Sequence, residues 1–246
     1  MKDTIIIQNH FALAGFTSGN DGIWTRNEPV DPPTRDYSEL SRKLNIPLSS
    51  IIRPYQANGD IVEIVNSNHG GFGVIKDNTL KKVDGLVTAE KGIVLSIIAA
   101  DCVPVYLIDE KTGVIGLLHC GWKSAAGELI HNAIKKMQLA GASLSEILMY
   151  IGPHICTGCY EVGQDVYAEY KKAFTENKLD TVFSVRCNKL LLNMSEAIKI
   201  KAVTEGISNA NIAYTDECTY HNADYYSYRR SDRGKQNLAY IMMKER

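Results

Sequence analysis

One continuous stretch, from Asp84 to Trp122, most constrains what this 246-residue chain can fold into. It contains three apolar runs separated by turn signals: Ile93–Ala99, Val103–Ile108 and Val114–Leu118. Apolar runs of this length are typical of strands that are covered on both faces. The stretch therefore predicts the centre of an α/β fold, with buried strands that need layers on both sides.

Three side chains with metal-binding or nucleophilic chemistry lie at the ends of these runs: Asp101, Cys102 and His119. Strand ends in α/β proteins favour functional sites, because the sheet fixes the side chains and the loops leave room for a ligand. Cysteine and histidine are usual zinc ligands, and a catalytic zinc site needs one further protein ligand. From the residues alone, a small buried apolar side chain is the favoured interpretation of Cys102.

The remaining pattern predicts one α/β domain over residues 1–246, without a linker, repeat or low-complexity tract. Expected helices, taken from apolar periodicity and end signals, are Asp36–Asn45, Ser124–Gly141, Gly163–Glu176 and Asn193–Glu205. Expected strands or strand pairs are Thr4–Ala14, Ile51–Val65, Ile147–Ile151, Ile212–Tyr214, Tyr225–Arg230 and Leu238–Met243. The Gly- and Pro-rich segment Gly15–Arg35 is predicted to be a loop.

Composition excludes several classes of function. A net charge of −1 gives no electrostatic basis for binding nucleic acid or an anionic membrane. The longest apolar run is interrupted by Asp101, so no segment is expected to span a bilayer. The N-terminal residues are too polar for a secretory signal, and the six cysteines are expected to be free thiols in a reducing compartment. We therefore expect a cytoplasmic protein.

Five segments together resemble a known family. The chain reads DGLVT from Asp84, ADCVPV from Ala100, HCGW from His119, IGPHICTGCYEVG from Ile151 and CTYHNADYYSYRRSDRGKQ from Cys218. This order and spacing resemble the laccase-domain family, whose members were first called multicopper polyphenol oxidases. They are now regarded as zinc-dependent purine nucleoside phosphorylases with adenosine deaminase activity. The resemblance extends from about Arg53 to the C-terminus.

The resemblance implies a single α/β domain with mixed sheets packed between helices in four layers, α/β/β/α. It implies phosphorolysis of purine nucleosides (adenosine, inosine, guanosine and methylthioadenosine) to the base and ribose 1-phosphate, with deamination of adenosine. The substrates are then a small-molecule nucleoside and phosphate, and the protein is expected to be a monomer or a small homo-oligomer.

The resemblance also assigns site residues. Zinc would be held by Cys102 and His119, and Asp101 would support the site or transfer a proton. A cationic side chain, Lys123 or Arg229, would neutralise the attacking phosphate.

The chain departs from the family where the third zinc ligand is expected. The family has a histidine in a Gln-x-His segment about forty residues before the cysteine, and this chain has Gln56-Ala57-Asn58 there. Gln56 and Asn58 are therefore placed with the substrate-binding residues. Because an amide oxygen is neutral and hard, it is a weaker zinc ligand than imidazole. This predicts weak zinc binding and slow turnover.

Two further segments leave alternatives open. His69, in an HGGFG loop, could replace the missing ligand or help to cradle a phosphate, but a flexible hairpin tip is the favoured interpretation. The Thr-Arg pattern that the family has near the N-terminus is absent, and Arg26 is the nearest arginine.

Rival functions follow from the same residues. A copper polyphenol oxidase needs many histidines, whereas this chain has six and no H-x-H pair. A thiol hydrolase could use Cys102 as nucleophile and His119 as base, without any third ligand. A non-catalytic binding protein of the same family is the other alternative. Metal content separates the enzyme of the family from both, and alkylation of Cys102 separates the hydrolase from the binder.

The other cysteines are given structural interpretations. Cys156 and Cys159 form a C-x-x-C pair, which is typical of a redox dithiol or half of a zinc site. Because we identify no partner pair, we expect this segment to form a wall of the site, and we assign no role to Cys120, Cys187 or Cys218. The tyrosines near the C-terminus, with Arg229 and Arg230, would either pack together or line a pocket for base and phosphate. The aromatic residues are Tyr220, Tyr225, Tyr226 and Tyr228.

Overall fold

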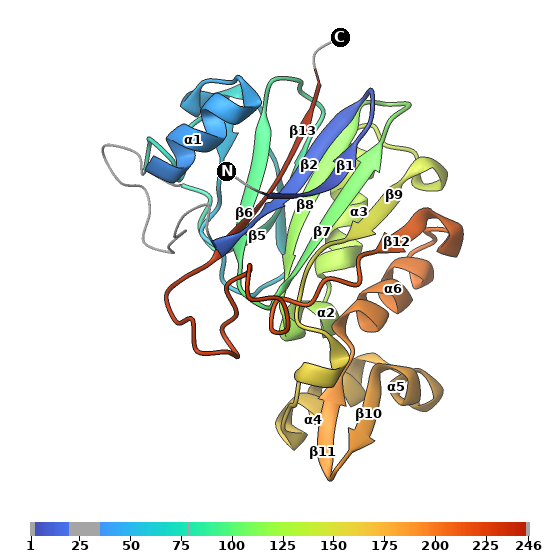
Figure 1. Ribbon diagram of the computed structural model, residues 1–246. Coiled ribbons are helices and arrows are strands. Elements are labelled where there is room, and N and C mark those ends of the chain that lie inside the picture. The colour runs from blue at the N-terminus through green and yellow to red at the C-terminus, as the bar shows by residue number, and fades with distance from the viewer. Residues whose placement is uncertain (1–2, 20–34, 78, 245–246) are drawn as a thin grey trace.

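The computed structural model describes residues 3–19, 35–77 and 79–244, and two large β-sheets form its centre (Figure 1). The first sheet has five strands in the order β1-β2-β13-β6-β3. Its strands are β1 (Asp3–Gln8), β2 (Ala12–Thr17), β13 (Asn237–Met243), β6 (Val94–Ala99) and β3 (Ile51–Ile52). The C-terminal strand β13 is antiparallel to both β2 and β6, so the two ends of the chain meet in this sheet.

The second sheet has six strands in the order β12-β9-β7-β8-β5-β4. Its strands are β12 (Ile212–Tyr214), β9 (Leu148–Ile151), β7 (Val103–Asp109), β8 (Val114–Cys120), β5 (Val83–Thr88) and β4 (Ile61–Ile64). The central pairs are antiparallel, and the two edge strands are parallel to their neighbours. A separate hairpin is formed by β10 (Phe183–Arg186) and β11 (Lys189–Leu192).

Helices cover the outer faces of the two sheets. The α-helices are α1 (Arg35–Leu44), α2 (Trp122–Ala126), α3 (Leu129–Leu139), α4 (Gln164–Ala173), α5 (Glu176–Val182) and α6 (Met194–Thr204). Short 3-10 helices are η2 (Leu48–Ser50), η3 (Ser67–His69), η4 (Leu144–Glu146), η5 (Thr157–Cys159) and η6 (Asn209–Asn211). None of these helices, in the described part of the chain, has the length and apolar character needed to cross a bilayer.

Three hydrophobic cores separate four layers. Leu40 of α1 packs with Val94 and Leu238 on the outer face of the five-stranded sheet. A second core fills the space between the sheets. The third lies against the outer face of the six-stranded sheet and includes Ile130 of α3 and Ile198 of α6. This confirms the expected α/β/β/α arrangement.

The predicted buried strands are present, and their alternation explains why they read as continuous apolar runs. In β7, Val105 and Leu107 face the helical layer, whereas Tyr106 and Ile108 face the other sheet. Every residue of β6, β7 and β8 is buried. A strand with protein on both faces has no solvent side on which polar residues would be favoured.

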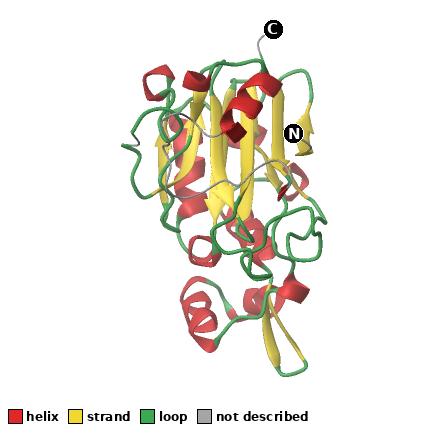
Figure 2. Ribbon diagram, turned by 60° about the vertical axis from the view of Figure 1, so that its left-hand side comes forward, coloured by secondary structure: helices red, strands yellow, loops and turns green. Residues whose placement is uncertain are grey.

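Helices α4 and α5 and the hairpin β10–β11 form a lobe that projects from one end of the sheets (Figures 1 and 2). The ring of Tyr170 lies 5.4 Å from that of Phe174 and 5.2 Å from that of Phe183, measured between centroids. These aromatic residues belong to the same hydrophobic cluster as the strands of the six-stranded sheet. We therefore propose that the lobe and the sheets form one domain, as expected for residues 1–246.

Two predicted elements are wrong. The helix predicted over Ser124–Gly141 is divided into α2 and α3 at Gly127, whose ψ of −150° is outside the helical range, and the Asp60 carboxylate lies beside this glycine. A Cβ on Gly127 would lie 2.6 Å from Asp60 Oδ2. The strand predicted over Tyr225–Arg230 is instead an irregular loop.

Two other predictions needed their boundaries changed. Ile51–Val65 does contain two strands, but β3 and β4 belong to different sheets, so the Asn58–Gly59 segment crosses between the layers. Strand β2 extends to Thr17 into the predicted loop Gly15–Arg35, and Arg26 lies outside the described residues.

Candidate active site

The strand pairing brings Cys102 and His119 together at one end of the six-stranded sheet. Strands β7 and β8 are antiparallel neighbours, with Val103 opposite Cys120 and Pro104 opposite His119. Cys102, immediately before β7, therefore lies next to the end of β8, close enough to the His119 ring to influence its charge. His119 is 1% exposed, so its ring position is fixed by the surrounding structure.

Asp84 of β5 organises this end of the sheet. Its Oδ1 accepts hydrogen bonds from His119 Nδ1 at 2.9 Å and from the backbone N–H of Asn58 at 3.0 Å. Its Oδ2 accepts from the backbone N–H groups of Ala57 at 3.0 Å and Gly59 at 2.8 Å. Burial alone would raise the pKa of Asp84, but His119 and these N–H donors lower it below its ordinary value.

Asp84 was not singled out from the sequence, where its only signal was its place in the DGLVT segment. The structure shows that one buried carboxylate sets the orientation of the imidazole and the conformation of the Asn58 loop together. A carboxylate bonded to one ring nitrogen leaves the other nitrogen for a ligand or a proton.

Asn58 lies beside Cys102, as expected from the alignment with the family's Gln-x-His segment. Its Oδ1 and the Cys102 Sγ lie 3.1 and 3.4 Å from the position that a Cβ on Gly121 would take. Gly121 therefore leaves room for both side chains. Asn58 has a φ of 57°, a left-handed conformation that asparagine and histidine adopt more readily than most residues.

The buried His119 ring carries a strong electrostatic bias. Burial by itself would lower its pKa, but the electrostatic interaction with Cys102 and the hydrogen bond to Asp84 raise the pKa of His119 to about 9. The ring is therefore biased toward its protonated form at neutral pH, and a bound metal would have to displace that proton.

The Asp101 carboxylate ties three segments of the chain together. Its Oδ1 accepts a hydrogen bond from Thr219 Oγ1 at 2.6 Å. Its Oδ2 accepts from Ser227 Oγ at 3.1 Å and from the backbone N–H of Arg229 at 2.7 Å. The Asp101 carbonyl accepts from the N–H of Ile155 at 3.2 Å. Asp101 adopts a φ of 81°, so this backbone is held in a sparsely populated conformation next to Cys102.

A cavity of about 810 Å³ opens onto Cys102 and His119. Three aromatic side chains line it together with Arg229, and they are Trp122, Tyr160 and Tyr228. The Arg229 guanidinium lies 5.2 Å from the centroid of the Tyr160 ring and donates to the Glu161 carbonyl at 2.8 Å. The cavity therefore combines flat apolar surfaces with one positive group.

Arg230 lies next to this cavity but has a different role. Its guanidinium donates to the carbonyls of Thr219 at 3.0 Å and Tyr220 at 2.9 Å, and to Asp232 at 2.8 Å. It therefore holds the loop before β13 in shape, and of the predicted aromatic and cationic cluster only Tyr228 and Arg229 line the cavity.

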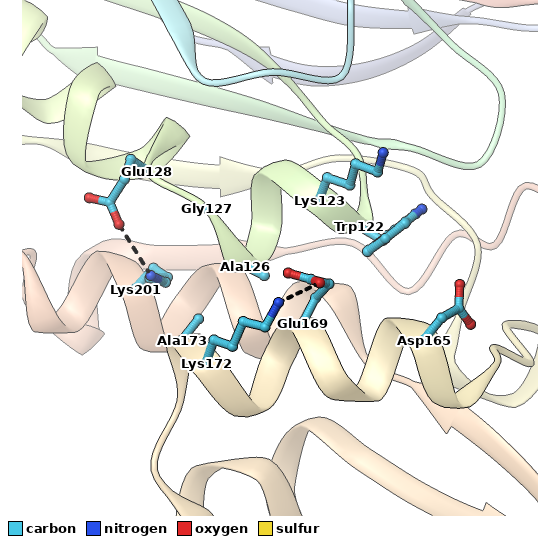
Figure 3. A pocket seen from close by; sticks show the side chains of 10 residues that line it. All are labelled: Trp122, Lys123, Ala126, Gly127, Glu128, Asp165, Glu169, Lys172, Ala173 and Lys201. Carbon is cyan, nitrogen blue, oxygen red and sulfur yellow. Dashed lines mark hydrogen bonds and ion pairs between the residues drawn. The ribbon is translucent and has the colours of Figure 1, made fainter.

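The other predicted substrate-binding residues lie elsewhere. The Gln56 side chain donates a hydrogen bond from Nε2 to the Ile98 carbonyl and accepts one at Oε1 from the Ile98 N–H, both at 2.8 Å. This side chain therefore anchors the Asn58 loop to β6. Lys123 lines a neighbouring cavity of about 790 Å³, which shares Trp122 with the first (Figure 3). Its Nζ lies 5.4 Å from the centroid of the Trp122 ring.

His69 is engaged locally. Its Nδ1 lies 2.9 Å from Asn66 Oδ1, in the capping of η3, and its ring lies against Phe72 with centroids 5.7 Å apart. Within the described residues, these contacts do not connect His69 to Cys102 or His119.

Comparison with known proteins identifies the family. The family described as multi-copper polyphenol oxidoreductase laccase matches residues 14–244. The chain belongs to this family.

Relatives within the laccase family carry enzyme names. A purine nucleoside phosphorylase of Deinococcus radiodurans is 32% identical over 83% of this chain and 74% of its own length. Adenosine deaminase RL5, from an unknown prokaryotic organism, is 28% identical over 78% of this chain and 74% of its own. The crystal structure of YlmD from Geobacillus stearothermophilus superposes with a TM-score of 0.84 and 25% identity, covering 99% of this chain and all of that one.

The donor set fits zinc with two strong ligands and one weak one. A thiolate and an imidazole are ligands that zinc prefers, and the Asp84–His119 hydrogen bond is the usual support for a metal-binding histidine. Asn58 offers a neutral amide oxygen beside Cys102, where a third ligand would be needed.

A second group of potential ligands corrects the interpretation of the C-x-x-C pair. Cys156 and Cys159 do have a partner pair, since Cys218 and His221 lie beside them. One ligand atom from each of the four lies within 4.8 Å of every other. The signal in the sequence was a C-x-x-H spacing in the C-terminal segment, which matches the C-x-x-C spacing in the earlier one.

Proposed function

We propose that this protein is a zinc-dependent purine nucleoside phosphorylase that also deaminates adenosine. The observation that carries the proposal is the convergence of Cys102 and His119 at a cavity with aromatic walls and one arginine, with Asn58 and Cys102 both next to Gly121. The names of the relatives support a reaction on purine nucleosides.

The cavity suits a nucleoside and a phosphate. Its volume of about 810 Å³ is in the range of small-molecule sites, roughly 300–1,000 Å³. Trp122, Tyr160 and Tyr228 offer ring faces against which a purine base can stack. Arg229 offers a planar cation that matches the geometry of a phosphate group.

Zinc bound by Cys102 and His119 would supply a Lewis acid toward an oxygen of the substrate or of water. Asp84 holds the His119 ring by its Nδ1, so the other nitrogen faces the site. We propose that the amide oxygen of Asn58 would be the third zinc ligand.

Asp101 acts, in this proposal, through its contacts. Its carboxylate holds the backbone of Arg229 and the Thr219 hydroxyl, so it positions the cation at the cavity. A proton-transfer role for Asp101 stays a prediction, and it would require one of these hydrogen bonds to break.

In phosphorolysis, a phosphate oxygen forms a bond to C1′ of the ribose while the bond from C1′ to the purine nitrogen breaks. The base leaves with that electron pair and takes up a proton, and ribose 1-phosphate remains. Arg229 would offset the repulsion of the phosphate dianion as it approaches. The adjacent tyrosines would exclude water, which competes with phosphate for C1′.

The test is the dependence of base release on phosphate. The protein is incubated with inosine or adenosine, with and without phosphate, and the products are separated. We expect hypoxanthine or adenine together with ribose 1-phosphate only when phosphate is present, and no product with Cys102→Ala. Release of base at the same rate without phosphate would show that the phosphorylase assignment is wrong.

A thiol hydrolase is the second candidate, and one observation favours it. Cys102 lies near His119, whose ring is hydrogen-bonded to Asp84, so a nucleophile, a base and an orienting carboxylate are together as in a catalytic triad. Treatment with a chelator, followed by iodoacetamide, separates the two candidates. Under the phosphorylase proposal, zinc protects Cys102 from alkylation, and the chelator removes both the protection and the activity. A hydrolase would stay active after treatment with the chelator.

A further inference from the structure

We propose that Cys156, Cys159, Cys218 and His221 form a second zinc site, which is structural and separate from the Cys102–His119 centre. All six cysteines are free, so none of these thiols is consumed in a disulfide. Three thiolates and an imidazole form one of the ligand sets of structural zinc.

The four ligand atoms lie close enough together to surround one metal ion. Cys159 Sγ lies 3.0 Å from His221 Nε2, and Cys156 Sγ lies 3.9 Å from His221 Nδ1. In a tetrahedral zinc site, with Zn–S near 2.3 Å and Zn–N near 2.0–2.1 Å, ligand atoms lie roughly 3.5–3.8 Å apart. Because all the ligand atoms here are within 4.8 Å of one another, small side-chain rotations would complete the site.

The backbone holds the two ligand pairs side by side. His154 pairs with Cys218 in a parallel bridge, and the N–H of Thr219 donates to the His154 carbonyl at 3.1 Å. The N–H of Cys156 donates to Cys218 Sγ at 3.2 Å. An N–H donor directed at a ligand sulfur is the kind of outer contact that supports metal thiolates.

The four protein ligands leave no open position, which indicates a structural site. Catalytic zinc sites keep one position for water or substrate, whereas structural sites are closed by four side chains. None of the four proposed ligands lines the cavity at Cys102, although Tyr160, the residue after Cys159, does.

The position of this cluster explains what it would stabilise. Thr219, next to Cys218, donates to the Asp101 carboxylate at 2.6 Å, and Ile155, next to Cys156, donates its N–H to the Asp101 carbonyl. The long loop between β12 and β13, which carries Cys218 and His221, crosses the end of the sheets (Figure 1). A metal joining the two segments would fix that loop against the wall of the cavity.

The test uses cobalt, whose thiolate complexes absorb light, in the full-length protein. The Cys102→Ala background removes the first centre, so the remaining signal reports the second. We expect a tetrahedral cobalt–thiolate spectrum there, and zinc should displace it. His221→Ala should weaken zinc binding by more than the roughly 10–100-fold typical of losing an outer-shell partner, and His221→Cys should restore it.

Matched variants keep the result interpretable. Cys187→Ser changes an exposed cysteine in the β10–β11 turn and should leave the spectrum intact. Because His221 is exposed, its replacement should not prevent folding, which circular dichroism can verify. The proposal is overturned if His221→Ala and Cys159→Ser both bind cobalt as the parent does. It is also overturned if protein purified under reducing conditions binds no metal and contains a Cys156–Cys159 disulfide.

Discussion

At the scale of single residues, Asp84 is the side chain on which the candidate site depends most. It is fully buried, and four donors converge on its two oxygens. A carboxylate can accept all four, whereas the isosteric amide has only one acceptor oxygen. Asp84 therefore couples the shape of the Asn58 loop to the orientation of His119.

We predict that Asp84→Asn reduces both stability and zinc affinity. It leaves at least one of these partly buried donors without an acceptor, which costs about 1–3 kcal/mol of unfolding free energy. It also releases the His119 ring, which should lower zinc affinity by roughly 10–100-fold. Urea unfolding and competition with a chelator measure the two effects.

Ser124→Ala is the control for this experiment. Its hydroxyl donates to the Gly59 carbonyl at 2.9 Å, so the variant loosens the same loop without touching His119. If the two variants lower zinc affinity equally, Asp84 acts only through the loop and the proposed support of His119 is incorrect.

At the scale of elements, the turn between β7 and β8 fixes the strand pair that carries Cys102 and His119. Asp109 is buried at the end of β7 and accepts from the N–H of Lys111 at 3.0 Å and of Thr112 at 3.2 Å. It also accepts from the N–H of Ser143 at 2.8 Å. Burial alone would raise the pKa of Asp109, but these donors lower it.

We predict that Asp109→Ala destabilises the protein by about 1–3 kcal/mol at neutral pH, because three backbone N–H groups lose hydrogen bonds to a charged acceptor. A lowered folded-state pKa means that the charged form stabilises the fold above the unfolded value near 3.9. That contribution is lost as the pH falls through the lower folded-state pKa.

Urea unfolding from pH 7 down to acid should therefore show the wild type and the variant converging below about pH 4. Asp180→Ala, an exposed position on α5, should change stability by no more than about 0.5 kcal/mol. A difference between wild type and Asp109→Ala that is independent of pH would contradict the role of the charge.

The strands could be predicted because burial on both faces produces long apolar runs, as in β6, β7 and β8. The break between α2 and α3 could not, because the apolar periodicity continues across Gly127, where the backbone leaves the helical conformation. The β10–β11 hairpin and α5 were also missed, because strands of 4 residues and a helix of 7 residues are too short to show a clear period.

At the scale of the whole molecule, the candidate site joins segments from both sheets. The Asn58 loop crosses from β3 in one sheet to β4 in the other, and it is anchored to β6 through Gln56. The proximity of Cys102, His119 and Asn58 could be predicted from the resemblance to the family. The several hydrogen bonds that Asp84 and Asp101 each accept could not be predicted, because their donors lie on segments that are distant in the sequence.

The same reasoning explains the cluster of Cys156, Cys159, Cys218 and His221. The two ligand pairs are 62 residues apart, and each is uninformative by itself. Only the pairing of His154 with Cys218 brings them together. A metal site built from two distant segments can therefore be recognised only when the fold shows that the segments are neighbours.

The most direct measurement of the central claim, that Cys102 and His119 form a zinc centre with Asn58 in third place, is zinc affinity in wild type and Asn58→His. A structural zinc contributes roughly ten kcal/mol or more, so an imidazole in place of the amide should add several kcal/mol. We predict that zinc affinity, by chelator competition, and phosphorolysis rate rise together in Asn58→His. If both stay unchanged in Asn58→His, while a parallel His69→Ala variant also leaves them unchanged, the account of this centre is contradicted.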